Sequence, residues 1–380
     1  MIHKQRLMPA FLSLGYLSIF MSCLFYGWSK TWSLLLIPTM YPPFADMRTV
    51  QGSLYSISVG LDPQTENPGD PWERVMNYPS IWIRVADILN LQIESHFLGF
   101  VSVQITLFLT CLFILIKCNP SILLLLLCFS NATLLCLERG NNDLLVFTLI
   151  FLAIRYKNLV AAVIISAVVL LKIYPLLVLP AFTRSRKTFG VMLMGTVISG
   201  SILWTELAAI RNGTPSSYGL SYGSPSLSQA IKEQLNFNFS TLFISSSLVV
   251  FGLLVASLNT SVDLGNFKNS SDADRMMFIS GSCVFVGTFL ISSNFDYRLI
   301  FLLFCVPLAL KWNKSILKYC FFTSLIAAFN FLPMVNGLGI TGGVLNLVAK
   351  LFLLVLLLVI LFKEFLRTLK QKIPIRDLLA

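Results

Sequence analysis

The sequence predicts an all-α polytopic membrane protein, and three observations support that fold class. Of the 380 residues, 56% are hydrophobic and only 12% are charged, whereas soluble domains average about 25% charged residues. The mean hydropathy is +0.80. Apolar stretches near the length of a spanning helix, about 20 residues, recur along most of the chain, and the polar gaps between them are mostly short. We therefore expect a single integral membrane domain over residues 1–380.

The apolar stretches predict about twelve transmembrane or partly re-entrant helices. The short stretches on either side of Glu138–Asp143 and Lys172–Pro175 are expected to enter the membrane part-way and line a cavity. In chain order the predicted segments are Pro9–Trp28, Phe97–Ile116, Ser121–Leu137, Leu144–Ile154, Leu159–Leu171, Pro175–Phe182, Val191–Leu207, Leu242–Leu258, Met276–Ser292, Leu299–Leu310, Leu317–Leu332 and Val344–Phe362.

The basic residues predict how these segments are oriented. Lys4 and Arg6 precede the first segment, so the positive-inside rule places the N-terminus in the cytoplasm. From that start, nearly every basic cluster falls on the cytoplasmic side, including the tail over residues 363–380. The net charge of +11 is spread over these short clusters, which excludes a nucleic-acid-binding face. The size and the short termini favour the plasma (inner) membrane of a bacterium.

This topology leaves two large loops on the outer side, over residues 30–96 and 209–239. We expect the first loop to be structured, because a turn signal at Gly60–Pro63 is followed by an amphipathic stretch. In that stretch Arg84 and Asp87 lie opposite an apolar face, so it should form a helix in the membrane interface. The apolar face consists of Ile81, Trp82, Val85, Ile88 and Leu89.

Charged residues on the outer side are not explained by topology. A charge at membrane depth costs roughly 2.5–3.5 kcal/mol on insertion scales, so such residues are expected to face a cavity or a partner. They are therefore the candidate functional residues of the chain. The set is Asp46, Arg48, Glu138, Arg139, Asp143, Lys172, Asp296 and Arg298.

Structural roles remain open for the same residues. Asp46 could cap a loop or pair with Arg48, and the Asn and Asp residues of the 139–143 turn could cap the next helix. Lys172 could extend to the outer interface, and Asp296 and Arg298 could form an interfacial ion pair. These roles are compatible with binding.

Several chemical classes lack their sequence signals. The chain has no GxxxxGK[ST] loop, no G-x-S-x-G and no HExxH sequence. His3 and His96 are its two histidines, so a histidine-based metal centre is not expected. We predict no cofactor and no required metal, although Asp46 and Asp143 could bind a divalent ion.

The outer-side motifs, taken in order, resemble membrane glycosyltransferases of the GT-C class, and most closely the glycosyltransferase 87 family of polyprenol-phosphate-dependent mannosyltransferases. The resemblance spans most of the chain, with Gln64 and Asn141 where the family more often has an aromatic residue and Gln. It rests on Phe44-Ala-Asp46-Met-Arg48, Asp62-Pro63, Asn77-Tyr78-Pro79, Arg139-Gly-Asn141-Asn142-Asp143, Lys172-Ile-Tyr174-Pro175-Leu-Leu-Val-Leu-Pro180 and Asp296-Tyr297-Arg298-Leu-Ile-Phe.

The resemblance implies an inverting hexosyltransferase, with mannose as the family-level sugar. Its donor would be a polyprenyl-phosphate sugar, and its acceptor a lipid-linked or glycan molecule on the non-cytoplasmic face. Asp46 matches the position of the family's general base. Cations would hold the departing phosphate, and a polar turn would orient the sugar. The candidate substrate-binding residues are Arg48, Arg139, Asn142, Asp143, Lys172, Asp296 and Arg298.

The sequence is also compatible with two other functions. A secondary transporter or lipid flippase would use the outer charges as coupling sites, and matching broken helices in the two halves of the chain would support it. Pro-interrupted segments occur around Lys172–Pro180 without a clear duplicate in the second half. A ligase or polymerase that moves whole glycans from a polyprenyl diphosphate would share the architecture and differ in its donor.

Overall fold

The computed structural model describes residues 2–156, 158–183, 185–214, 220–258, 270–313, 316–330 and 340–372. The described chain is mostly helical, and its segments form two compact units. The first unit holds residues 1–215 and 297–303, and the second holds residues 216–296 and 304–380. The expectation of one membrane domain stays a prediction.

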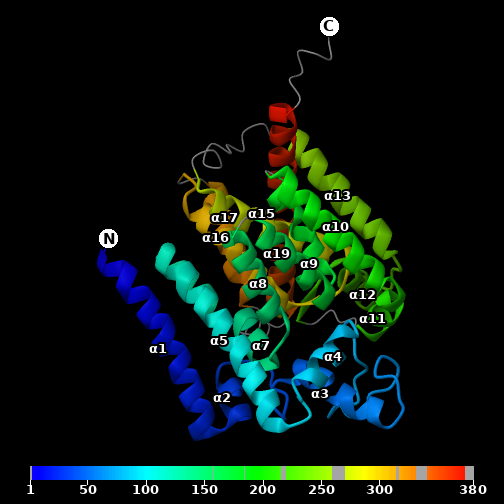
Figure 1. Ribbon diagram of the computed structural model, residues 1–380. Coiled ribbons are helices and arrows are strands. Elements are labelled where there is room, and N and C mark those ends of the chain that lie inside the picture. Colours follow the sequence, from blue (N-terminus) through cyan, green and yellow to red (C-terminus); the bar gives the residue numbers. More distant parts are fainter. Residues whose placement is uncertain are drawn as a thin grey trace. The chain divides into compact units, whose positions relative to one another are not determined.

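The first unit consists of helices. Its α1 and α5 pack together, and α9 packs against both α8 and α10. The helices of the first outer loop, α2, α3 and α4, lie together at one end of the long helices of this unit (Figure 1). The bounds are α1 Ile2–Tyr26, α2 Trp28–Leu34, α3 Ala45–Ser58, α4 Ile81–Ile88, α5 Glu94–Cys118, α6 Ile122–Cys128, α7 Asn131–Arg139, α8 Asp143–Tyr156, α9 Leu159–Leu171, η1 Tyr174–Phe182, α10 Arg186–Leu203, η2 Trp204–Glu206 and α11 Leu207–Gly213.

The second unit is arranged around α19, which contacts α13, α15 and α17. Its two short strands pair antiparallel, with Ser221 opposite Phe295 and Tyr222 opposite Asn294. The 3-10 helix η3 (Asp296–Cys305) begins in this unit and contributes residues 297–303 to the first. The other bounds are β1 Ser221–Tyr222, α12 Ser224–Leu235, α13 Thr241–Leu258, α15 Asp272–Ile291, β2 Asn294–Phe295, α16 Val306–Leu310, α17 Ile316–Phe329 and α19 Ile340–Lys372.

Membrane character is clear from seven helical stretches of the described residues that are long and apolar enough to cross a bilayer. Most of the Thr241–Leu258 stretch is exposed on the protein, as expected for a surface that contacts lipid, whereas Asp272–Ile291 is mostly buried. The seven stretches are Leu7–Tyr26, Glu94–Cys118, Ile122–Arg139, Arg186–Gly213, Thr241–Leu258, Asp272–Ile291 and Gly342–Thr368.

The twelve predicted apolar segments are helical over almost all of their described residues, and the predicted helix Leu159–Leu171 is confirmed at both ends. Seven helical stretches of the described residues are long and apolar enough to span a membrane, while segments such as α8 and η1 are shorter, so the count of about twelve spanning or partly re-entrant helices stays a prediction. The predicted second outer loop contains β1 and α12, while residues 215–219 lie outside the described residues. The same holds for residues 373–380 of the predicted tail.

The first outer loop is folded, as predicted. Its amphipathic helix α4 packs on α3 and α9, with Trp82 fully buried and its indole N–H donating to the carbonyl of Leu171 at 2.9 Å. Ile88, by contrast, is 77% exposed. One part of the predicted apolar face therefore packs against the protein, and another part is exposed. The loop therefore attaches to the end of α9, directly before Lys172.

A pair of glycines holds α3 against the rest of this loop. A β-carbon on Gly52 would lie 2.4 Å from the backbone carbon of Gly69 and 2.5 Å from the backbone nitrogen of Asp70. Only glycine permits such a close approach of two backbones. Asn67 strengthens the same contact, because its side-chain amide donates to the carbonyl of Thr49 at 3.1 Å.

We expect Gly52→Ala to lower stability by about 1–3 kcal/mol, the usual cost of overpacking, because backbone atoms of residues 69 and 70 cannot move aside like a side chain. Thermal unfolding in detergent and limited proteolysis of the first loop would measure this. Gly99→Ala is the matched control, since nothing lies within 4 Å of a β-carbon there. Equal melting temperatures for the two variants would show that the close contact between the two backbones does not contribute to stability.

Candidate active site

The turn between α7 and α8 forms the centre of the candidate site. Gly140 ends α7 with a φ of 56°, a left-handed conformation that glycine adopts without cost. A β-carbon on Gly140 would lie 2.8 Å from that of Phe44, so the turn touches the residue that precedes α3. The Asn141 side chain accepts from the backbone N–H of Asp143 at 2.8 Å and caps α8. The expected capping role is therefore present, and it lies beside the first loop.

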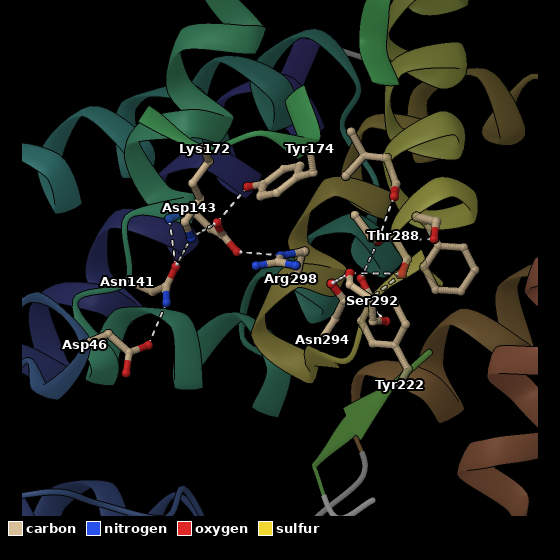
Figure 2. Close-up of polar contacts among 12 residues, drawn as sticks. Asp46, Asn141, Asp143, Lys172, Tyr174, Tyr222, Thr288, Ser292, Asn294 and Arg298 are labelled. Carbon is tan, nitrogen blue, oxygen red and sulfur yellow. Dashed lines mark hydrogen bonds and ion pairs between the residues drawn. The ribbon is translucent and has the colours of Figure 1, made fainter. Parts of the chain in front are cut away.

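The Asn141 amide joins the first loop to the end of α9. Its Nδ2 donates to Oδ2 of Asp46 at 2.6 Å, and the hydroxyl oxygen of Tyr78 lies 3.5 Å away. Its Oδ1 also accepts from Nζ of Lys172 at 3.1 Å. One buried side chain thus connects Asp46 with Lys172 (Figure 2).

Asp143 is the most enclosed charge of the site, with no exposed surface. It pairs with Nζ of Lys172, accepts from the Tyr174 hydroxyl at 2.6 Å and accepts from Nε of Arg298 at 3.2 Å. Figure 2 shows Lys172, Tyr174 and Arg298 directed toward this carboxylate from separate segments. The α9 end, η1 and η3 therefore meet at the first residue of α8, where the helix dipole also favours a negative charge.

Aromatic rings flank the two cations. The Arg298 guanidinium lies 4.5 Å from the ring centre of Tyr174, and Nζ of Lys172 lies 5.2 Å from that of Tyr78. These are cation–π distances. Tyr78 belongs to the first loop, and burial raises the pKa of its phenol well above the usual value, with further increases from the charges of Asp46 and Asp143. The phenol therefore stays protonated at neutral pH and remains a hydrogen-bond donor.

Asp46 is the more accessible carboxylate, with a side chain that is 14% exposed. Its Oδ1 lies 3.5 Å from Nη1 of Arg74, so its salt bridge is to Arg74 and not to Arg48. Burial alone would lower the pKa of the Arg74 guanidinium, but the hydrogen bond to Asp70 and the charges of Asp46 and Asp70 raise it overall. Arg74 is therefore a permanent cation beside Asp46.

Arg48 contributes to a different contact. It pairs with Glu94 at 2.7 Å, donates to the carbonyl of Pro43 at 2.8 Å and lies 4.7 Å from the ring centre of Phe97. This arrangement fixes α3 to the start of α5. Among the substrate-binding candidates, Arg48 is therefore positioned as a structural residue.

Arg139 pairs with its neighbour Glu138, which is fully buried. The Glu138 carboxylate also accepts from the backbone N–H of Met40 at 2.9 Å and from the Trp28 indole at 3.3 Å. Glu138 and Arg139 thus hold the chain that leads to Asp46 against the end of α7.

Asp296 and Arg298 serve separate partners, although one residue lies between them in the sequence. Asp296, in the second unit, is fully buried and pairs with Nζ of Lys350 at 2.6 Å. Lys350 also donates to the carbonyl of Ser221 at 3.3 Å. The interfacial ion pair considered for Asp296 and Arg298 is replaced by a buried pair within the second unit.

Asn142 is fully buried, and neither its amide nitrogen nor its amide oxygen has a hydrogen-bond partner among the residues that the structure describes. Buried amides are nearly always hydrogen-bonded. This amide, in the same turn as Asn141 and Asp143, is therefore a candidate contact for a bound polar group.

Five residues with clear roles were not among the sequence candidates. Asn141, Tyr78 and Tyr174 lie inside the motifs that carry the family resemblance. They would have been candidates if every polar residue of those motifs had been chosen. Arg74 belongs to none of the motifs. Lys350 lies within an apolar helix, and sequence spacing does not identify Asp296 as its partner.

The site places a partly exposed carboxylate, Asp46, near the cations Lys172 and Arg298, which suits proton acceptance beside a bound anion. Its other charged residues are Asp143 and Arg74. Within the described ranges, no group of three or more His, Cys, Asp or Glu side chains is placed to hold a metal ion.

Comparisons with protein-family models, with curated proteins and with solved structures give no match for this chain.

Proposed function

We propose that this protein is a membrane glycosyltransferase that moves a hexose, in the mannose class, from a polyprenyl-phosphate donor to a lipid-linked or glycan acceptor. The observation that carries the proposal is the link between Asp46 and the cation cluster. Asp46 is a partly exposed carboxylate, and Asn141 joins it to Lys172, which pairs with Asp143 beside Arg298. A base next to an anion site suits this transfer.

The proposed reaction is a single displacement. Asp46 takes the proton of the acceptor hydroxyl while that oxygen attacks the anomeric carbon. The bond from this carbon to the phosphate oxygen breaks, its electron pair leaves with the phosphate, and the anomeric configuration inverts. Lys172 and Arg298 stabilise the charge that grows on the phosphate. Tyr78 and Tyr174 supply ring faces and hydroxyl groups that suit a sugar.

An open apolar groove, whose lining includes the residue that follows Lys172 in the chain, supports a lipid-linked donor. It has a volume of about 490 Å³ and is lined by Ile173 and Leu176 together with residues of α10, η2 and α11. Ile173 directly follows Lys172 in the chain. A polyprenyl chain in this groove would bring its phosphate close to the cations, as an amphiphilic donor requires.

The proposal includes a GT-C-like arrangement of about twelve spanning or partly re-entrant helices with both termini in the cytoplasm. The first loop and the candidate site would then lie on the outer face of a bacterial plasma membrane. The positive-inside pattern of the basic residues supports this orientation.

A second candidate function, transport or lipid flipping, is favoured by one observation. The ion pair between Asp296 and Lys350 is fully buried in the second unit, and buried ionisable residues in membrane helices often mark ion or proton pathways. Solute or lipid flux in proteoliposomes, sensitive to Lys350→Met and without sugar transfer, would favour this candidate over the first.

We expect Asp46→Asn to reduce kcat by at least about 100-fold, the lower end of general-base contributions, because the amide keeps the shape and cannot accept the proton. The assay uses purified protein, radiolabelled polyprenyl-phosphate mannose, glucose and other hexoses, and a cell lipid extract. Asp87→Asn is the matched control, since Asp87 is an exposed carboxylate of the same loop. Equal transfer by wild type and Asp46→Asn would remove Asp46 from the proposed role.

We also expect Arg298→Gln to reduce kcat by about 100-fold, a typical cost of losing one charge-stabilising donor. Arg298→Lys should recover part of this loss, because it restores the cation without the planar fork. Arg84→Gln, which removes an exposed arginine of α4, is the control. If folded Arg298→Gln has wild-type kcat and donor KM, Arg298 does not contact the phosphate.

A further inference from the structure

Asp70, in the first outer loop, is a buried carboxylate outside every motif discussed above. It accepts hydrogen bonds from the Thr49 hydroxyl at 3.1 Å and from the backbone N–H groups of Trp72 at 3.1 Å and Arg74 at 3.0 Å. Its side chain has no exposed surface. Asp70 is therefore rigidly attached both to α3, through Thr49, and to its own loop.

Arg74 is held by Asp70 in a two-point contact. Nε of Arg74 donates to Oδ2 of Asp70 at 3.1 Å, and Nη2 donates to Oδ1 at 2.9 Å. Nη2 also donates to the carbonyl of Ala45, the first residue of α3. The guanidinium lies 4.7 Å from the ring centre of Trp72. Planar two-point contacts of this kind fix orientation as well as distance.

The remaining nitrogen of this guanidinium is directed to the proposed base. Nη1 of Arg74 lies 3.5 Å from Oδ1 of Asp46, while Asn141 donates to Oδ2 of the same carboxylate at 2.6 Å. The two oxygens of Asp46 are thus contacted by different groups, one from the first loop and one from the α7–α8 turn. The hydrogen bond on one oxygen and the cation near the other together favour one orientation of the carboxylate.

From this geometry we infer that Asp70 and Arg74 are positioning residues that orient Asp46 toward the acceptor hydroxyl. The inference rests on the proposed function and names two residues that the motifs do not contain. Arg74 takes no proton itself. Each of its three nitrogens already has a protein oxygen as a partner, which favours positioning over binding of a substrate anion. Loss of orientation at a reacting group can cost about 100-fold in rate.

A double-mutant cycle tests this inference. Arg74→Gln should lower kcat by about 10- to 100-fold with little change in the KM of the donor, since donor contacts lie elsewhere. In the Asp46→Asn background the same substitution should have almost no further effect, because a residue that acts only through Asp46 has nothing left to orient. Arg74→Lys should recover part of the activity.

Two further measurements keep the result interpretable. Arg84→Gln removes an exposed arginine from the same loop and should leave kcat unchanged, and melting temperatures identify variants that fail to fold. An effect of Arg74→Gln that is equally large in the wild-type and the Asp46→Asn backgrounds overturns the inference, and so does wild-type kcat in Arg74→Gln. A rise confined to KM would assign Arg74 to substrate binding instead. Absence of transfer by wild type with every donor would contradict the proposed function itself.

Discussion

A buried carboxylate that must be neutralised determines how the first unit is assembled. Asp143 has no exposed surface, and burying an unpaired ion costs several kcal/mol even after the protein relaxes. Lys172, Tyr174 and Arg298 meet that requirement from the end of α9, the start of η1 and the start of η3. Because removal of one partner from such a pair typically costs about 3–5 kcal/mol, these segments cannot separate without a large penalty.

Under the proposed function, the other candidate charges divide between structural support and chemistry. Glu138 and Arg48 each fix the chain around α3, through Met40 and Trp28 in one case and through Glu94 in the other. This leaves Asp46 at the junction, with its backbone held by structural contacts and its side chain partly open. Stable placement of a reactive group by surrounding residues that do not react is a general requirement of enzyme sites.

The sequence predicted most of the long apolar helices and part of the site, but not the loop helices α3 and α12. Hydrophobic runs gave Leu159–Leu171 with both ends, because an apolar run bounded by Asn158 and Lys172 has clear end signals. The charges that topology does not explain include Asp143, Lys172 and Arg298, and these three are in contact in the structure. Partner choice could not be predicted in the same way. Some partners depend on a close approach of two segments, such as Gly140 against Phe44. Others lie in loops without a regular pattern or, like Lys350, inside an apolar helix.

The Asn141 amide donates hydrogen bonds through its nitrogen and accepts them through its oxygen. Each end can therefore face only one kind of partner. Its nitrogen faces the carboxylate of Asp46, and its oxygen faces Lys172 and the start of α8. An aspartate at this position has nearly the same shape, yet it would bring two carboxylates together at about hydrogen-bond distance and force them to share a proton. The hydrogen bonds observed at this position therefore require an amide, which can donate at one end and accept at the other.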